Sequence, residues 1–407
     1  MRVTQVSSSE GFRSAAGERL AFADILRGLA SVIVVLGHFT YLYLHSPSMV
    51  ASLIYSEPAA VVDLPGAVLS VYDFFNAASV GVAVFFLISG FVIPLSIENA
   101  DVRGYFIKRL LRIYPTFWVA LALSIVALVV STTYWAKPLP LTWRDYFANA
   151  ALATEWSGRF DILSVAWTLQ IELKFYLIAP LIAWAIARNR TPLILLWAFG
   201  VAGLYWLATA GCDADLLTCW GRRAPWVYVA WEGLYITFML IGSVFYAHYR
   251  RRVSTLTATL LIAVLFASFT VSYFLSHLSA MGPARNTILP YAEALVIFTV
   301  FYFNRNRLRL VQPLKFFADV SYPLYVVHPL VGYTIMRILT AQGVPYVLAL
   351  ALALIIVFSL ATLMHRYVEK PSIALGKRLA KRAARRRAPP DKSPPLEAAT
   401  TSGSAQG

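Results

Sequence analysis

The chain has 407 residues, of which 59% are hydrophobic and only 14% charged, against about 25% charged in a typical soluble domain. Its formal net charge of +15 could indicate a nucleic-acid partner, but residues 377–407 alone hold eight Lys or Arg against two Asp or Glu, and much of the rest lies in short loops between apolar runs. This placement is typical of a polytopic membrane protein and argues against nucleic acid as a partner.

The apolar runs predict an all-α, polytopic integral membrane bundle of about ten transmembrane helices. Residues 1–19 lack the apolar core of a cleavable signal, so 1–20 are expected to be a short cytoplasmic segment, followed by a membrane domain over 21–371. Residues 372–407 predict a basic, disordered cytoplasmic tail that touches anionic lipid. The ten predicted helices are 22–44, 77–97, 113–132, 164–186, 192–209, 226–246, 256–275, 287–303, 317–339 and 345–365.

The loops between these helices sort by charge. Strongly basic loops alternate with loops that hold few or no Lys and Arg, although Arg222 and Arg223 break the pattern. Under the positive-inside rule, both termini and the loops at Lys108 and Arg251 face the cytoplasm, and the loop with Glu57 faces outward. We therefore expect a multi-pass protein of the cell (inner) membrane.

The two cysteines, Cys212 and Cys219, fall in one predicted loop. A disulfide would form there if the loop faces an oxidising compartment, and two free thiols fit the spacing equally well. The sequence shows no cluster with metal-ligand spacing, so no metal is expected.

The first span, 21–44, carries three ionisable residues, Asp24, Arg27 and His38. Such residues are expensive inside a bilayer and usually mark function. Arg27 and His38 are eleven residues apart, so they share a helix face and lie roughly 16 Å apart along the axis. Asp24 precedes Arg27 by three residues, which allows an ion pair.

This span resembles the opening helix of the membrane acyltransferase-3 family, whose signature is a basic residue, ten intervening residues and a histidine. Here these are Arg27 and His38. Five further segments resemble the family's motifs and run in the family's order: GVAVFFLISGFVIP (81–94), FIKRLLRIYP (106–115), WTLQIELKFYLIAP (167–180), SYPLYVVHP (321–329) and RYVEKP (366–371). In the segment 167–180, Thr168 replaces a serine of the family's motif and keeps its hydroxyl.

The resemblance implies an O-acyltransferase, which moves an acyl group, commonly acetyl, from cytoplasmic acyl-CoA to a hydroxyl of a carbohydrate or glycolipid acceptor. His38 would be the general base, and Glu172 would orient or complement it. Surface polysaccharide, lipopolysaccharide, peptidoglycan precursor, glycolipid and antibiotic all remain open as acceptors.

The donor's phosphates would be bound by Arg27, Arg109 and Arg112, because fixed guanidiniums suit phosphate groups. Gly90 would give room for a neighbouring helix or for the donor's pantetheine arm. The residues expected to support the site are Asp24, Ser89, Phe91, Thr168, Tyr325 and His328.

His38, Glu172 and the arginines at 109 and 112 could also have purely structural roles. His38 could be a histidine hydrogen-bonded between helices, and Glu172 could form an ion pair with Lys174 or Arg27. Arginines at 109 and 112 also fit plain positive-inside topology.

The ninth predicted helix differs from the family pattern near its histidine. Pro329 follows His328 directly and Pro323 lies between Tyr322 and Leu324, so we expect a local bend there. Ser321, Tyr325 and His328 fall on one stripe of this helix, which would also suit a polar packing network.

Two other classes of protein remain as alternatives. A transporter also places buried charges on broken helices, but no inverted repeat is evident. A lipid-interacting structural protein would leave the buried histidine and glutamate without a role. An acyltransferase accounts for both.

Overall fold

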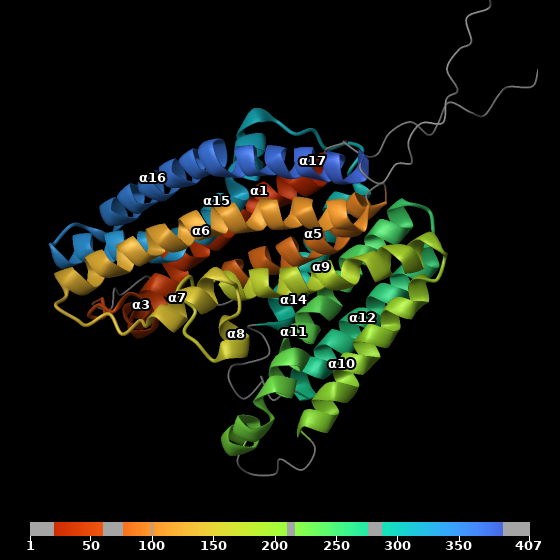
Figure 1. Ribbon diagram of the computed structural model, residues 1–407, viewed down its shortest axis with the longest axis horizontal. Coiled ribbons are helices and arrows are strands. Elements are labelled where there is room, and N and C mark those ends of the chain that lie inside the picture. The colour runs from red at the N-terminus through yellow and green to blue at the C-terminus, as the bar shows by residue number, and fades with distance from the viewer. Residues whose placement is uncertain (1–19, 60–75, 99–100, 210–215, 276–286, 386–407) are drawn as a thin grey trace, which may run out of the picture.

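The computed structural model describes residues 20–59, 76–98, 101–209, 216–275 and 287–385, with only the backbone described for 208–209, 216–228 and 384–385. Every regular element in these residues is a helix (Figure 1). Eight of the described helices are long and apolar enough to cross a membrane, and two shorter apolar helices, Thr191–Leu207 and Ile288–Phe303, accompany them. The predicted all-α membrane bundle is confirmed, whereas the count of ten spans stays a prediction.

Three helices form the centre of the bundle: α1 (Ala21–Gly37), α5 (Ala77–Ile97) and α15 (Gln312–Ala341). α1 passes directly into a π-helical turn at His38–Leu42 and packs chiefly against α15 and α5. Glycine makes these approaches close, since a Cβ at Gly28 would lie 2.9 Å from the backbone nitrogen of Ala318. Small residues at helix contacts are typical of membrane bundles.

The other helices surround this centre (Figure 1). α16 and α17 follow one another along one edge, while α10, α11 and α12 form the opposite side. Their bounds, with those of the short connecting helices, are α2 (Tyr43–His45), α3 (Pro47–Ile54), α6 (Val102–Tyr134), α7 (Trp143–Ala150), α8 (Thr154–Ser157), α9 (Ala166–Ala187), a 3-10 turn (Thr191–Leu193), α10 (Ile194–Thr209), α11 (Leu216–Tyr249), α12 (Thr255–Leu275), α14 (Ile288–Phe303), α16 (Tyr346–Met364), a π-helical turn (His365–Glu369) and α17 (Lys370–Arg385).

Most predicted helix ends agree with the structure to within a few residues, and α5 has the predicted bounds. The predicted starts of two helices are wrong. α6 begins at Val102 rather than 113, and α11 begins at Leu216 rather than 226. Lys and Arg are good helix formers, so a helix continues past the apolar stretch that defines its span. Arg109 and Arg112 consequently lie inside α6.

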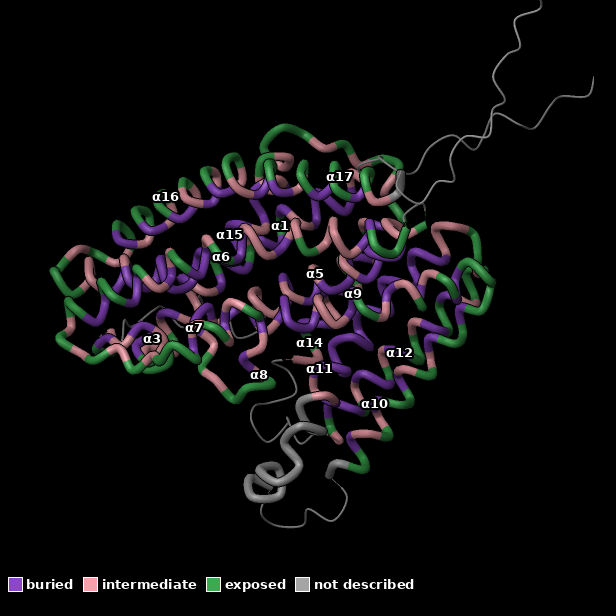
Figure 2. Tube along the Cα trace, in the orientation of Figure 1, coloured by how far each residue is buried: buried purple, intermediate pink, exposed green. Residues whose placement is uncertain are grey.

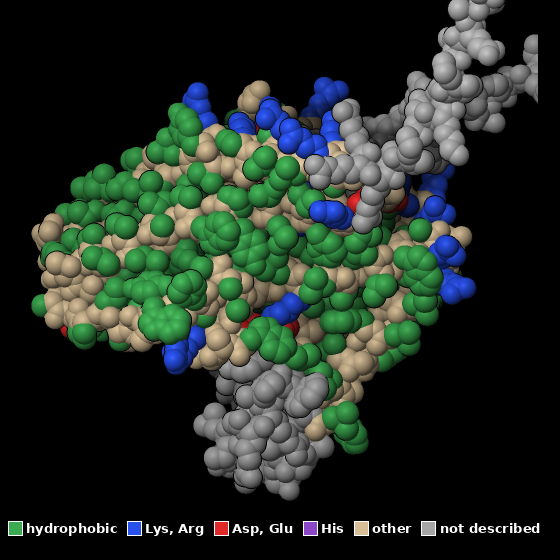
Figure 3. All heavy atoms as spheres, in the orientation of Figure 1, with side chains coloured by type: hydrophobic (Ala, Val, Ile, Leu, Met, Phe, Trp, Pro, Cys, Tyr) green, Lys and Arg blue, Asp and Glu red, His purple; other side chains and the backbone are tan. Residues whose placement is uncertain are grey.

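The buried residues face the centre of the bundle, and large apolar side chains cover its outside (Figures 2 and 3). Leu181 on α9 and Val347 on α16 are 69% and 72% exposed. Apolar side chains facing outward in such numbers suit contact with lipid tails. Lys and Arg side chains gather along α17 and at the adjoining end of the bundle in this view (Figure 3).

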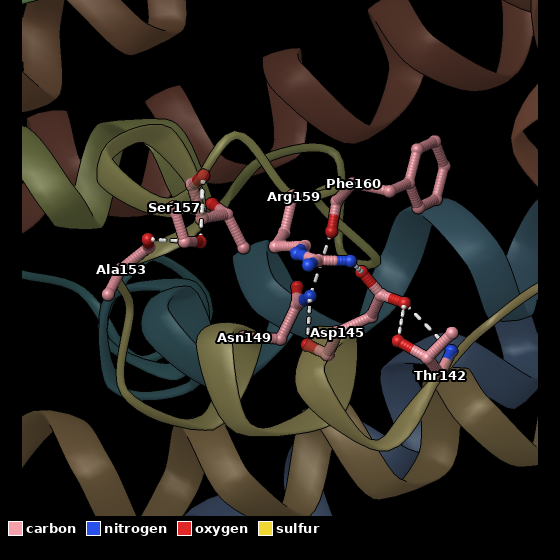
Figure 4. A network of polar contacts seen from close by, with 8 residues as sticks. Thr142, Asp145, Asn149, Ala153, Ser157, Arg159 and Phe160 are labelled. Atoms are coloured by element: carbon pink, nitrogen blue, oxygen red, sulfur yellow. Dashed lines mark hydrogen bonds and ion pairs between the residues drawn. The ribbon is translucent and has the colours of Figure 1, made fainter. Parts of the chain in front are cut away.

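The segment between α6 and α9, predicted as a loop, is folded (Figure 4). Asp145 accepts hydrogen bonds from the backbone nitrogen and the hydroxyl of Thr142, at 2.7 and 2.6 Å, which caps α7 and lowers the pKa of Asp145. Asn149 donates to the backbone oxygens of Asp145 and Phe160, each at 2.8 Å. Arg159 adds an ion pair of 3.6 Å to Asp145. These contacts hold the chain that leads into α9.

The predicted disordered tail is partly wrong, because α17 extends to Arg385. Residues 370–385 form an amphipathic helix whose small residues, Gly376 and Ala380, pack on α6. The rest of the tail lies outside the described residues. So do Cys212 and the side chain of Cys219, which leaves their disulfide a prediction.

Candidate active site

A cavity of about 200 Å³ lies between α1, α5, α6, α9 and α15. We call it the arginine cavity, because three of the predicted arginines line it. Four other predicted site residues also line it, namely Ser89, Thr168, Glu172 and Tyr325. Aromatic and aliphatic side chains complete its wall. Its polar lining residues are Arg27, Ser89, Arg109, Arg112, Thr168, Glu172, Tyr176, Ser321, Tyr322 and Tyr325.

The three arginines differ in what already holds them. Arg27 forms the predicted ion pair with Asp24, at 3.3 Å, which is thereby confirmed. Arg109 donates to the hydroxyl of Ser96 and stacks over the ring of Tyr176, with its guanidinium carbon 5.2 Å from the ring centroid. Arg112 forms no hydrogen bond or ion pair with any described residue, although its electrostatic neighbours include two carboxylates. Its charge is balanced by Glu369 and Glu172, while its N–H groups donate to no described residue.

Glu172 lies among these arginines, not beside His38. Its carboxylate accepts from the hydroxyl of Tyr176 at 2.7 Å and from that of Ser89 at 3.3 Å. The alternative ion pair with Lys174 is also wrong, because Lys174 pairs with Glu155 and Glu232. Glu172 thus supplies negative charge that helps to hold the cations of the cavity in place.

His38 pairs with His328. Its Nδ1 lies 2.7 Å from Nε2 of His328, and the two rings stack with centroids 4.9 Å apart. The predicted role of Glu172 as the partner that orients His38 is therefore wrong, and His328 takes that place. His38 is also the first residue of the π-helical turn, and such turns are frequent at functional sites.

Pro329 fixes where the proton of His328 sits. Proline has no N–H, so the carbonyl of Tyr325, four residues earlier, lacks its usual helical donor. His328 Nδ1 lies 2.9 Å from that oxygen and 3.1 Å from the carbonyl oxygen of Leu324. A carbonyl can only accept, so Nδ1 carries the proton and Nε2 is an acceptor. His38 Nδ1 must then donate to His328, which leaves a lone pair on His38 Nε2.

Tyr325 connects the arginine cavity to the histidine pair. It lines the cavity, its hydroxyl lies 2.9 Å from that of Thr168, and its ring centroid is 6.1 Å from that of His328. Neither histidine lines the cavity, but the pair lies next to Tyr325 in its wall. Along the first span, the helical rise separates Arg27 from His38 by roughly 16 Å.

Two predicted site residues have packing roles. A Cβ at Gly90 would lie 1.8 Å from the backbone oxygen of Met239, so Gly90 allows α5 to contact α11 and does not line the arginine cavity. Phe91 is fully buried and packs edge-on against Phe22 and Tyr246. The prediction that Gly90 makes room for a helix is confirmed, and its role in binding a donor is not supported.

Sequence reasoning missed two residues at the arginine end. Tyr176 joins Glu172 to Arg109, and it lies in the same quoted segment as Glu172. Glu369 is 3% exposed, bonds to His365 at 2.6 Å and lies within electrostatic range of Arg112. Glu369 belongs to the RYVEKP segment, which the sequence shows, but the sequence does not show that this residue lies near Arg112.

The fold and the site define a multi-pass membrane protein with a cation-lined cavity and, next to Tyr325 in the wall of that cavity, a pair of histidines. The chain belongs to the membrane acyltransferase-3 family: residues 20–366 match the model of that family, which is described as an acyltransferase domain. The resemblance predicted from the six segments is thereby confirmed, and the protein is an acyltransferase.

The known proteins that are similar to this chain include two from bacteria. Nodulation protein 10 of Rhizobium leguminosarum bv. viciae is 26% identical over 343 residues, which cover 77% of this chain and 83% of the relative. Acyltransferase MdmB of Streptomyces mycarofaciens is 30% identical over 131 residues, which cover 30% of this chain and 33% of that protein. No solved structure matches the chain.

Proposed function

We propose that the protein transfers an acyl group, acetyl in the simplest case, from cytoplasmic acyl-CoA to a hydroxyl of a carbohydrate or glycoconjugate at the cell (inner) membrane. The observation that carries the proposal is the arginine cavity, which is lined by three arginines and by Tyr325, whose ring centroid lies 6.1 Å from that of His328 in the histidine pair. A donor with a phosphorylated head and a long arm that ends in a thioester fits this shape.

The donor's pyrophosphate would bind at Arg27, Arg109 and Arg112, which all line the arginine cavity. Arg112 has no hydrogen-bond partner among the described residues and would supply charge-assisted hydrogen bonds. The arm would then lie against the apolar wall of the cavity, which includes Val82, Phe85 and Phe86. The thioester would arrive beside Tyr325, close to the histidine pair.

His38 would act as the general base. Its Nε2 takes the proton of the acceptor hydroxyl as that oxygen attacks the thioester carbonyl. The carbon–sulfur bond then breaks, and the imidazolium returns the proton to the leaving thiolate, giving an ester and coenzyme A. His328 holds His38 in the required tautomer and shares the developing positive charge through the Nδ1–H···Nε2 hydrogen bond.

The acceptor would approach from the outer side, opposite the arginines. The proposed topology follows from loop charge, with the arginine end in the cytoplasm. Acceptors could therefore be modified after they reach the outer leaflet, and no acceptor would need to pass the arginine cavity. Mass spectrometry of surface glycans from a deletion strain would identify the modified hydroxyl.

Donor binding tests the proposal directly. Arg112→Ala should weaken acetyl-CoA binding to the purified protein by about 10- to 150-fold, because a hydrogen bond to a charged group contributes about 1.5–3 kcal/mol. Arg103→Ala removes the same charge from an exposed position on the same helix and should leave binding unchanged.

Turnover separates the enzyme from a transporter. The purified protein should release coenzyme A from acetyl-CoA only when a hydroxyl acceptor is present. Substrate flux in sealed vesicles without thioester turnover would instead identify a transporter. If an Arg109→Ala, Arg112→Ala double variant bound acetyl-CoA with unaltered affinity, the two arginines would not bind the donor and would serve only membrane topology.

A further inference from the structure

A second cavity of about 160 Å³ opens beside the arginine cavity, between α5, α6 and α17. We call it the entrance cavity. Four cations line it, namely Lys108, Arg109 and Arg112 from α6 and Lys377 from α17. Arg109 and Arg112 also line the arginine cavity, so the two cavities adjoin at these side chains.

α17 is held on α6 by small residues, and this contact places Lys377. A Cβ at Gly376 would lie 3.3 Å from Cβ of Leu111 and 3.5 Å from Cα of Lys108. One turn further on, Ala380 lies against Gly104 in the same way, at 3.3 Å. Lys377 therefore reaches the entrance cavity from a helix that is fixed at two points.

No carboxylate among the described residues lines the entrance cavity. The charges of Arg109 and Lys377 both repel that of Lys108. Glu369 lines a neighbouring cavity together with Asp24, Arg27 and Arg112 instead. Glu369 and Glu172 partly balance the charge of Arg112 from the neighbouring cavities. No described carboxylate lines the entrance cavity beside Lys108 and Lys377, so this cavity is suited to a ligand that carries a phosphate.

We propose that Lys377 and Lys108 bind the phosphate on the ribose of the donor's nucleotide, which makes α17 part of the acyl-CoA site. The inference rests on the proposed function. Coenzyme A carries a pyrophosphate and a separate ribose 3′-phosphate. Arg112 and Arg109, at the junction of the two cavities, would face the pyrophosphate, and the two lysines would face the phosphate that lies further from the thioester.

Coenzyme A and 3′-dephospho-coenzyme A, which differ only in that phosphate, test the assignment by titration of the purified full chain in detergent. Wild-type protein should bind coenzyme A more tightly than 3′-dephospho-coenzyme A. Lys377→Ala should weaken coenzyme A binding by about three- to tenfold, because the lysine is exposed, and should leave binding of the dephospho compound unchanged. Arg378→Ala is the matched control, since this neighbouring cation does not line the entrance cavity.

Other results would overturn the assignment. Equal loss for both ligands would place Lys377 at another part of the donor. No loss for either ligand, together with reduced binding of phosphatidylglycerol nanodiscs, would identify a lipid headgroup as the phosphate bound there. If wild-type protein bound neither coenzyme A compound, the proposed function itself would fail, whereas normal donor binding and turnover in Lys377→Ala would reject this inference alone.

Discussion

The histidine pair makes a prediction about His328 that differs from that for His38. His38→Ala should lower kcat about 10²- to 10⁴-fold, the usual contribution of a positioned general base. His328→Ala removes the acceptor that lies 2.7 Å from His38 Nδ1. In the transition state that bond joins a developing imidazolium to a neutral nitrogen, and hydrogen bonds to charged groups contribute about 1.5–3 kcal/mol. The expected loss of kcat is therefore about 10- to 150-fold.

The double variant distinguishes a shared role from two separate ones. Because His328 acts through His38, removing both should lower kcat no further than His38→Ala alone. His328→Gln should recover part of the activity, since its amide oxygen can accept from His38 Nδ1. His45→Ala, which removes an exposed histidine further along the same span, should leave kcat unchanged.

Single-turnover release of coenzyme A at saturating acetyl-CoA is the appropriate assay, because it separates the chemical step from donor binding. Acetyl-CoA affinity should be unaltered in all these variants, since none of the three histidines lines the arginine cavity and Arg27 lies about 16 Å from His38 along the first span. A double variant that loses the product of the two single effects would mean that the histidines act independently. If His328→Ala were the more damaging single change, the base would have to be assigned to α15.

Three other predictions follow from the same geometry. Gly90→Ala should lower the yield of folded protein, because its Cβ would lie 1.8 Å from a backbone oxygen of α11, whereas Gly200→Ala, with no atom within 4 Å of the added Cβ, should be tolerated; equal yields would refute the packing role. Glu172→Gln should change acetyl-CoA affinity but leave the single-turnover rate at saturating donor unchanged. A rate as low as that of His38→Ala would instead show that Glu172 takes part in the chemical step. Burial raises the pKa of Asp161 from 3.8 to about 6, so the folded protein binds this proton more tightly than the unfolded chain does. The stability that the protonated carboxyl contributes is therefore fully present below pH 3.8 and is lost as the pH rises through about 6. Thermal unfolding of Asp161→Asn should show a weaker pH dependence over this interval than the wild type, and parallel curves would contradict the shift.

The features that the sequence predicted correctly are those set by nearby residues. The helix at α5 follows from one continuous apolar run, and the ion pair of Asp24 and Arg27 follows from their spacing of three residues. Arg112 and Glu172 were found because motif residues that lie apart in the sequence resemble those of one family. Both line the arginine cavity.

The features that were missed depend on how the helices pack. His38 and His328 are 290 positions apart, and no local pattern shows that their rings meet. Gly90 is identical in sequence whether it faces α11 or a ligand, and only the structure shows Met239 against it. The helix over 370–385 was overlooked because its basic residues resemble those of a disordered segment, although their spacing gives it one face of small residues.

Pro329 has a consequence for how this enzyme can evolve. An amide at position 329 would compete with the ring of His328 for the carbonyl of Tyr325, and the tautomer that serves His38 would lose its advantage. The two neighbouring positions should therefore vary together: a chain that keeps His328 gains from an imino acid after it, and one that loses the histidine has no such reason to retain the proline. Joint randomisation of 328 and 329 under selection for acyl transfer should recover histidine and proline as a pair, even though proline never touches a substrate.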